Sequence, residues 1–426
     1  MYIPFDKIGR TLGLFFPKYS YYIIKFFNGL KISANCRYIN KNQKTVLKRI
    51  KKKFGKEPLK VVFYVYEPCR WKSQSIYDLM AQDERFEPLI VVTKNRLSNQ
   101  NPNCQSAEDI KNTYQFFKDK NMNVTYGYDI ENEQFIPFKN FNPDLIFYSH
   151  PWYVETSQGP VVCSKFALTY YVPYFVANTP SDIDYNLRFH QYIHRHYVLN
   201  EEIKSEYEKG QERKSNNFAA VGHPQLDFFY LNKENCEKKY VIYSPHWSIL
   251  GESQSFATFE WNGKYILEFA KKHPEINWVF KPHPLLFKQT IASKFMTQEE
   301  VQEYYDSWKS IAKYCDDGNY MSLFKESYAM ITDCGSFLTE YFMSKNPVIH
   351  LVSPDAWEYN NNVKQIVKSY YQAHNLEELE KYLQEIIIDK KDYKKQERLD
   401  LLEKLQLSNN YCAGNIIKNL EQEFNA

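Results

Sequence analysis

Residues 328–340 read YAMITDCGSFLTE, in which an apolar run is followed by a short turn and then by a helical pattern. The run Tyr328–Thr332 predicts a buried strand, and Ser336–Ser344 predicts the helix that follows it. A strand that leads directly into a helix is the repeating unit of a parallel sheet. In such a unit the amides of Gly335 and Ser336 lie at the positive end of the helix dipole, which favours the binding of an anion. The alternative is that Asp333 or Ser336 only caps the helix.

The same alternation of short apolar runs and amphipathic stretches continues on both sides of this unit. It begins at Leu59. The runs predicted as strands are Leu59–Tyr66, Glu87–Val92, Met122–Tyr126, Asp144–Ser149, Val172–Ala177, His196–Leu199, Phe218–Val221, Tyr240–Ser244, Asn277–Phe280, Tyr328–Thr332 and Pro347–Val352. The stretches predicted as helices are Ser73–Glu84, Ser106–Asp119, Trp261–Lys272, Val301–Tyr314, Ser336–Ser344, Leu376–Ile388, Lys391–Gln406 and Tyr411–Phe424. Apolar strands separated by helices indicate parallel sheets covered on both faces. We therefore predict an α/β protein with two open sheets, divided at the polar stretch Asn232–Lys239.

The composition excludes several common kinds of site. The 426 residues are 43% hydrophobic and 25% charged, which provides enough apolar side chain for substantial cores. The 13 Gly residues include no GxG, so the chain has neither a GxGxxG dinucleotide loop nor a Walker-type ATP loop. The eight Cys residues form no CxxC and no zinc-like spacing with His. We therefore expect free thiols in a reducing cytoplasm and no metal site.

The N-terminal segment differs in charge from the rest of the chain. Residues 1–60 hold 15 Lys and Arg against two acidic side chains, whereas the whole chain has a net charge of only +3. Aromatic residues are frequent in the same segment, and rings together with Lys favour contact with an anionic membrane surface. The alternatives are a helix packed on the body with a solvated basic face and, less favoured, nucleic-acid binding without a recognisable module. Because Pro17, Lys18 and Lys25 interrupt the most apolar early stretch, we expect neither a signal peptide nor a spanning helix.

The motif Lys281-Pro282-His283-Pro284 directly follows the predicted strand Asn277–Phe280. Two prolines stiffen the backbone around the imidazole and hold it at the carboxyl end of a strand, where open α/β sheets bind their ligands. At that place His283 can donate to a phosphate oxygen or carry a proton, and Lys281 can neutralise charge. The alternative is a loop histidine between two turn prolines.

Two further motifs lie at the same predicted edge of the second sheet. In Tyr243-Ser244-Pro245-His246-Trp247, His246 is placed to contact the base or the phosphates of a nucleotide and Trp247 to stack on it, although packing is an equal alternative. Glu340 lies one turn into the helix after Gly335, where it can accept hydrogen bonds from ribose hydroxyls.

The first half of the chain supplies its own candidates. His150 follows the predicted strand Asp144–Ser149, and we predict that it faces the cleft and acts as the general base for an acceptor hydroxyl. The spacing of His190, His194 and His196 fits a solvated face or a core better than a metal site, because no carboxylate or thiolate ligands are near in sequence. The run Gly222-His223-Pro224-Gln225-Leu226-Asp227 is predicted to form a fixed turn that borders the cleft.

Together these motifs resemble the CDP-glycerol glycerophosphotransferase family of teichoic-acid and capsule enzymes. The matching residues are Lys281-Pro282-His283-Pro284, Ile331-Thr332-Asp333-Cys334-Gly335-Ser336, Pro347-Val348-Ile349, Gly222-x-Pro224-x-x-Asp227 and Tyr243-Ser244-Pro245. The block Val61–Val92, with Trp71-Lys72-Ser73-Gln74-Ser75-Ile76-Tyr77, is also similar to members of that family. The resemblance runs from about Leu59 to the C-terminus and is more specific in the second half than in the first.

The resemblance implies a GT-B fold, in which two Rossmann-like domains face each other across a cleft. It divides the chain into a basic aromatic extension (1–58), an acceptor domain (59–232), a nucleotide-donor domain (233–408) and a C-terminal helix that crosses back to the acceptor domain (409–426). It also implies that His283 binds the donor pyrophosphate, that Ser336 and the amides around Gly335 hold phosphate oxygens, and that Asp333 shapes their loop. Two family features are absent: the Trp-His-Gly motif, where this chain reads YVPYFVANTP (171–180), and the C-terminal Arg, where it reads NNYCAGN (409–415).

We therefore predict a cytoplasmic transferase of surface-polysaccharide assembly, peripheral on the inner face of the cell membrane. It would transfer glycerol phosphate or a related polyol phosphate from a CDP-linked donor to a lipid-linked or polysaccharide acceptor and release CMP. No nucleic-acid partner and no cofactor beyond the nucleotide-activated donor is expected. The predicted catalytic residues are His283 and His150, and the predicted donor-binding residues are Lys281, His246, Ser244, Asp333, Gly335, Ser336 and Glu340. A glycosyltransferase that uses a nucleotide sugar and a non-catalytic GT-B-like scaffold are the alternatives.

Overall fold

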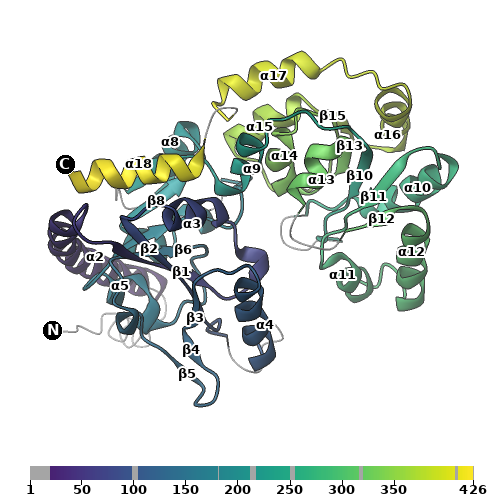
Figure 1. Ribbon diagram of the computed structural model, residues 1–426. Coiled ribbons are helices and arrows are strands. Elements are labelled where there is room, and N and C mark those ends of the chain that lie inside the picture. The colour runs from purple at the N-terminus through teal and green to yellow at the C-terminus, as the bar shows by residue number, and fades with distance from the viewer. Residues whose placement is uncertain are drawn as a thin grey trace.

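The computed structural model describes residues 20–97, 104–180, 182–211, 217–249, 255–315, 320–407 and 411–425. The first 19 residues of the basic extension and the short stretch 408–410 lie outside these ranges. Figure 1 shows two α/β domains next to each other, each built on one parallel sheet, with the last helix lying over the first domain.

The first domain contains a seven-stranded sheet with the order β3-β2-β1-β6-β7-β8-β9, and every pair in it is parallel. Its strands are β1 (Leu59–Val65), β2 (Phe86–Val92), β3 (Val124–Tyr126), β6 (Leu145–Tyr148), β7 (Leu168–Tyr171), β8 (Arg195–Val198) and β9 (Phe218–Ala220). Its helices are α3 (Gln74–Ala81), α4 (Ala107–Lys118), α5 (Pro160–Cys163), α6 (Asp182–Tyr185), α7 (Arg188–Tyr192), α8 (Glu201–Gly210) and α9 (Asp227–Leu231). The small hairpin of β4 (Tyr128–Asp129) and β5 (Gln134–Phe135) is inserted after β3.

The second domain contains a six-stranded parallel sheet with the order β12-β11-β10-β13-β14-β15. Its strands are β10 (Tyr240–Ser244), β11 (Asn277–Phe280), β12 (Lys313–Tyr314), β13 (Ser327–Thr332), β14 (Val348–Leu351) and β15 (Tyr371–Ala373). Its helices are α10 (Phe259–Lys272), α11 (Leu286–Ala292), α12 (Gln298–Ile311), α13 (Met321–Glu326), α14 (Gly335–Phe342), α15 (Asn361–Lys368), α16 (Leu376–Tyr382) and α17 (Lys395–Lys404). This is the strand order of a doubly wound nucleotide-binding sheet, with its switch point between β10 and β13.

One predicted strand of the first sheet is wrong. Val172–Ala177 is not a strand, because Pro173 has no N–H for a ladder and the chain leaves the sheet there. The strand is instead β7, which lies immediately before it and is buried on both faces. The displaced segment 172–180 therefore runs from the carboxyl end of β7, which places it at the edge of the sheet where ligands bind.

The described part of the N-terminal segment is α2 (Ser20–Lys53), a long helix that packs against the first domain. Its buried side chains recur every three or four residues, as in a helix with one face on a core. They are Cys36, Ile39, Gln43, Val46 and Ile50. Arg49 and Lys53 add ion pairs to the carboxylate of Asp144, at 3.2 Å and 2.6 Å.

The last helix, α18 (Cys412–Asn425), packs on the first domain although it follows the second in sequence (Figure 1). Asp227 fixes its start, since its carboxylate accepts from the backbone N–H of Cys412 at 2.7 Å and of Ala413 at 3.0 Å. Near the other end, Glu423 accepts from His194 and Arg195 of the first domain at 2.8 Å and 3.0 Å. The chain therefore passes between the domains twice, once in each direction.

Candidate active site

The carboxyl ends of β10 and β13 meet at the switch point of the second sheet, and hydrogen bonds join the loops that leave them. Ser244 and Thr332 are partners in the parallel register, and the Thr332 hydroxyl donates to the Ser244 carbonyl at 2.6 Å. The Ser244 hydroxyl in turn donates to the carbonyl of Lys281 at 2.6 Å, which ties the neighbouring strand end to the same point. Ser244 is buried, so it is a structural link here.

Asp333 holds the same loops together from within. One carboxylate oxygen accepts from the backbone N–H of His246 at 2.6 Å, and the other accepts from the backbone N–H and hydroxyl of Thr258 at 2.7 Å and 2.8 Å. Burial raises the pKa of Asp333 to about 6, so the carboxyl is mostly ionised at neutral pH. The enclosed position of Asp333 agrees with a residue that shapes the loop.

His283 and His246 come together at this edge, with ring centroids 5.4 Å apart. The backbone N–H of His283 donates to the Pro245 carbonyl at 3.0 Å, which joins the two loops. Burial lowers the pKa of His283 to about 4 and that of His246 to about 3, so both rings are neutral at pH 7. In each ring Nδ1 accepts from a backbone N–H, of Leu285 and of Ser248 respectively, which leaves the proton on Nε2. Each ring therefore keeps its Nε2–H as a donor.

Helix α14 begins at Gly335, close to the two imidazoles. The ring of Phe256 links the two places, because it lies edge-on to His246 at 5.7 Å and 3.5 Å from where a Cβ of Gly335 would be. Ser336 is half-exposed, and its hydroxyl lies 3.6 Å from the Cys334 sulfur. The backbone N–H of Phe337 donates to the Cys334 carbonyl at 3.0 Å, whereas those of Gly335 and Ser336 precede the first bonds within the helix, so these two can donate to phosphate oxygens. The structure thus brings His283, His246 and the Gly335–Ser336 turn to one place.

Asn178 is a residue of this site that none of the sequence motifs includes. A Cβ on Gly335 would lie 2.1 Å from the Asn178 side-chain nitrogen, so this amide of the first domain lies directly against the start of α14. Asn360 holds the segment there: its backbone N–H donates to the Asn178 carbonyl at 2.9 Å and its side chain donates to the Ala177 carbonyl at 2.7 Å. The usable signal is the polar end of the stretch YVPYFVANTP, which directly follows the wrongly predicted strand.

Glu340 occupies a polar network between the domains. Its carboxylate accepts from the Tyr320 hydroxyl at 2.7 Å and from the side-chain amide of Gln225 at 3.2 Å. Burial raises its pKa to about 7, although the positive charges of Lys72 and Lys281 act in the opposite direction. Glu340 is 2% exposed, so a ribose hydroxyl would have to replace a protein donor to reach it. The Lys281 amine lies 4.6 Å from the centre of the Tyr320 ring, at the same network.

The expectation that His150 faces the cleft is wrong. The residue is 0% exposed, its ring lies 4.0 Å from that of Tyr66, and its Nδ1 is bonded to the Ser149 hydroxyl at 3.0 Å. Burial lowers the pKa of His150 well below its usual value. Because aromatic side chains cover the imidazole, it cannot meet an acceptor hydroxyl in this arrangement, and the structure does not support it as the base.

The histidine cluster of the first domain also lies mostly inside it. His190 and His196 are fully buried with their rings stacked at 5.2 Å, whereas His194 pairs with Glu423. In the described ranges, no three His, Cys, Asp or Glu side chains are grouped so that they could hold a metal ion. The eight cysteines are free thiols, as expected.

The run 222–227 forms a tight turn after β9, with a short 3-10 turn at Pro224–Leu226. His223 donates from Nε2 to the Pro173 carbonyl at 2.9 Å. This bond fixes the segment that leads to Asn178. The turn therefore helps to position that segment and does not itself line the site.

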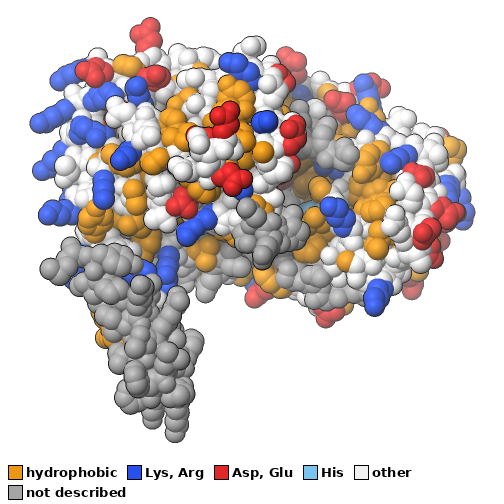
Figure 2. All heavy atoms as spheres, turned by 90° about the horizontal axis from the view of Figure 1, so that it is seen from below, with side chains coloured by type: hydrophobic (Ala, Val, Ile, Leu, Met, Phe, Trp, Pro, Cys, Tyr) orange, Lys and Arg blue, Asp and Glu red, His pale blue; other side chains and the backbone are white. Residues whose placement is uncertain are grey.

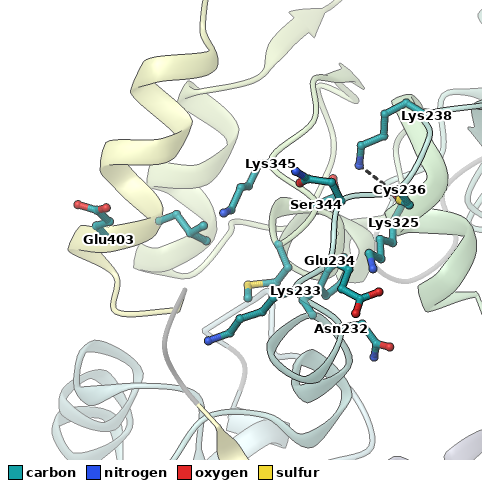
Figure 3. A pocket seen from close by; sticks show the side chains of 13 residues that line it. Asn232, Lys233, Glu234, Cys236, Lys238, Lys325, Ser344, Lys345 and Glu403 are labelled. Atoms are coloured by element: carbon teal, nitrogen blue, oxygen red, sulfur yellow. Dashed lines mark hydrogen bonds between the residues drawn. The ribbon is translucent and has the colours of Figure 1, made fainter.

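A cavity of about 440 Å³ lies at the opposite edge of the second sheet, beside the linker that leads into β10 (Figure 3). Lys233, Lys238, Lys325 and Lys345 line it. The Lys238 amine donates to the Lys325 carbonyl at 2.6 Å, near the C-terminal end of α13, where a positive charge is favourable. Because this cavity is at the amino ends of the strands, it is not the predicted ligand edge.

Two parallel α/β domains with their carboxyl edges toward a shared cleft, and a last helix that returns to the first domain, define the GT-B fold. The sequence matches no protein-family model and no curated protein. Solved structures match over most of the chain at low identity. A variant of the wall teichoic acid polymerase TagF gives a TM-score of 0.55 at 12% identity, over 94% of this chain and 98% of its own.

Two further solved structures have similar values. An S. aureus MnaA structure with UDP gives a TM-score of 0.54 at 12% identity, over 86% of this chain and 97% of its own. The UDP-GlcNAc 2-epimerase of Neisseria meningitidis, bound to UDP-GlcNAc, gives 0.54 at 12% identity, over 85% of this chain and 99% of its own. At this identity the similarity establishes the GT-B fold, which confirms the fold predicted from the sequence.

Proposed function

We propose that this protein is a GT-B transferase of surface-polysaccharide assembly that moves glycerol phosphate or a related polyol phosphate from a CDP-linked donor to a glycan acceptor. The observation that carries this proposal is the convergence of His283, His246 and the start of α14 at the switch point of the second sheet. The similarity of the fold to that of a wall teichoic acid polymerase supports the proposal. The resemblance of these motifs to the CDP-glycerol glycerophosphotransferase family supports it as well.

In this proposal the donor pyrophosphate lies on the first-turn amides of α14. His283 and His246 donate from Nε2 to its oxygens, and Lys281 adds positive charge from the same loop. The acceptor hydroxyl attacks the phosphorus that carries the polyol, the bond from this phosphorus to the CMP oxygen breaks, and the hydroxyl proton passes to solvent. Catalysis then rests on positioning and on stabilising charge at the leaving phosphate. The reaction calls for no cofactor beyond the activated donor.

The released nucleotide tests this proposal. We expect CMP when the purified protein is incubated with CDP-glycerol or CDP-ribitol and a membrane extract as acceptor, with mass spectrometry of the small molecules. Calorimetry should show binding of CDP in preference to UDP and GDP. The matched control is the His283→Ala variant, which should keep the fold but lose one hydrogen bond to the donor pyrophosphate. Nucleotide binding without any release from the donors would contradict a transferase and favour a scaffold.

A second candidate is a glycosyltransferase that uses a nucleotide sugar. It is favoured by the solved structures with a similar fold that carry UDP or UDP-GlcNAc. The same phosphate site would then hold the donor while the acceptor attacks carbon, and the leaving group would be the nucleoside diphosphate. The same assay with UDP- and GDP-linked sugars added as donors separates the two candidates, because release of UDP or GDP instead of CMP would identify sugar transfer.

We also propose that α2 holds the protein at an anionic membrane surface. Within the described ranges, none of the helices combines the length and the apolar character that crossing a bilayer requires. Tyr22 and Phe26 near the start of α2 are 70% and 63% exposed. Lys and Arg side chains gather at the left edge of Figure 2, over the first domain. On α2 the exposed basic side chains on the side away from the core include Arg37, Lys41, Lys44, Lys48 and Lys52.

Charge reversal on α2 should release the protein from anionic vesicles. Deleting the whole segment would open the core that Val46 and Ile50 fill, so we choose the exposed triple variant Lys41→Glu/Lys44→Glu/Lys48→Glu. Each Lys near an anionic surface contributes about 1 kcal/mol, so the bound fraction in a flotation assay should fall more than ten-fold. The matched control is Lys264→Glu/Lys271→Glu/Lys272→Glu, with exposed positions on α10. Equal flotation of both variants and the wild type would rule out contact through α2.

A further inference from the structure

A cavity of about 850 Å³ lies between the first domain and α13 of the second. Its walls are the loop after β1 with the start of α3, the end of α4, and the segment around α9. It includes part of the block 71–77, which resembles the transferase family and to which the donor site gives no task. The volume is in the range of pockets that bind small ligands, and cavities between domains are common binding places.

Aromatic side chains provide flat apolar walls on one side of this cavity. Trp71 lines it and is held by edge-on contacts with Phe63 at 5.6 Å and Phe117 at 5.2 Å. Phe116 and Phe228 line it as well, and both are half-exposed. A side chain with a rigid apolar face binds well to a ligand that has an apolar face of its own.

A fixed row of polar groups faces the same space. The Trp71 ring N–H donates to the Gln74 side-chain oxygen at 2.9 Å, and the Gln74 amide donates to the Asp78 carboxylate at 2.8 Å. Asp78 is exposed at the cavity, and only one of its oxygens has a protein donor among the described residues. A carboxylate only accepts, so its ligand must donate, as a hydroxyl does.

The two lysines of the cavity already have partners. The Lys120 amine lies 4.6 Å above the Phe116 ring, and the Lys72 amine lies 5.4 Å from the Tyr320 ring, close to the carboxylate of Glu340. Three acidic side chains, those of Glu67, Asp78 and Asp227, line the cavity against these two lysines. The cavity therefore has no net positive field, which disfavours a phosphate-rich ligand and favours a neutral one with hydroxyl groups.

We propose that this cavity binds the neutral sugar rings of the acceptor glycan, with ring faces on Trp71 and Phe116 and hydroxyl groups on Asp78. The proposal rests on the proposed function, since it assigns the acceptor side of the same reaction. Gln225 connects the two sites, because it lines the cavity and donates to Glu340 at the interdomain network. A glycan held here lies on the first domain while its end reaches toward the donor phosphates on the second.

Saturation-transfer NMR and calorimetry test this proposal with neutral oligosaccharides of two to four hexose or N-acetylhexosamine units. We expect at least one to bind the wild type, and we expect Phe116→Ala and Asp78→Asn each to weaken that binding about ten-fold. Asp78→Asn is isosteric and keeps an acceptor for Gln74, so it reports on binding even if Phe116→Ala destabilises the fold. The matched control is Asp119→Asn, at an exposed carboxylate just after α4, which should bind like the wild type.

Two results would overturn the proposal: no oligosaccharide of the panel binds, or both variants bind as the wild type does. Glycerol phosphate oligomers are tested in parallel, and binding of these alone with loss in the same variants would also overturn it, in favour of an anionic acceptor. CDP binding is measured on the same samples. Retained CDP binding with no sugar binding removes only this inference, whereas loss of nucleotide binding in the wild type removes the proposed function.

Discussion

Replacing His283 with Ala is expected to lower kcat by about 10²–10³-fold, the usual loss when one preorganised donor to a developing anion is removed. The neutral ring carries its proton on Nε2, because Nδ1 accepts from the Leu285 N–H at 3.1 Å and burial keeps the pKa of the ring at about 4. The alanine variant loses this donor while the backbone bond from residue 283 to Pro245 stays. Initial rates of nucleotide release measure the change.

The control for this prediction is His374→Ala, at an exposed histidine that pairs with Glu378 far along the second domain. It should have wild-type rates. His283→Asn supplies an N–H from a shorter side chain and should recover part of the loss, which a purely structural role would not explain. Unfolding midpoints close to that of the wild type would show that the variants are folded. Near-normal kcat for His283→Ala would contradict the pyrophosphate role.

Local signals in the sequence are sufficient to predict most of the second sheet. Tyr240–Ser244 and Asn277–Phe280 are strands with the predicted bounds, and the helix after Thr332 begins one residue before the predicted Ser336. In each case an apolar run ends at a polar residue, and a Pro or Gly follows within three positions, so hydrophobic pattern and turn chemistry agree. Correct strand ends also predict that the three motifs after these strands lie at one edge of the sheet, because the carboxyl ends of parallel strands meet on one side.

The sequence is insufficient where packing between distant segments decides the outcome. The apolar letters of 172–177 resemble a strand, but Pro173 and the bonds from His223 and Asn360 hold this segment outside the sheet. His150 follows a strand end as an active-site residue would, yet aromatic rings from β1 and the loop after it pack on the imidazole and bury it. Asn178 becomes visible only through its contact with Gly335, a pairing that no local pattern contains.

Gly335→Ala is expected to cause the second large loss, because the added methyl group collides with the Asn178 side chain and forces its amide away from the start of α14. Its Cβ would lie 2.1 Å from the side-chain nitrogen of Asn178 and 3.3 Å from the adjoining carbon. The backbone carbonyls of 177 and 178 are both bonded to Asn360, so Asn178 cannot move away as a whole. Overpacking of this kind costs about 1–3 kcal/mol. We expect a lower unfolding midpoint, together with nucleotide affinity at least ten-fold weaker by calorimetry.

A double-mutant cycle with Asn178→Ala identifies the cause of that loss. If the clash between the domains is responsible, removing the Asn178 amide makes room for the methyl group, and the two changes should couple by about 0.5–3 kcal/mol in unfolding free energy. Nucleotide affinity should not recover with stability, because the double variant also lacks the Asn178 amide that lies against the start of α14, where the proposed site holds the phosphates. Full recovery of both stability and affinity in the double variant would mean that Gly335 serves only the contact with Asn178, and the phosphate site would have to be placed elsewhere in the cleft.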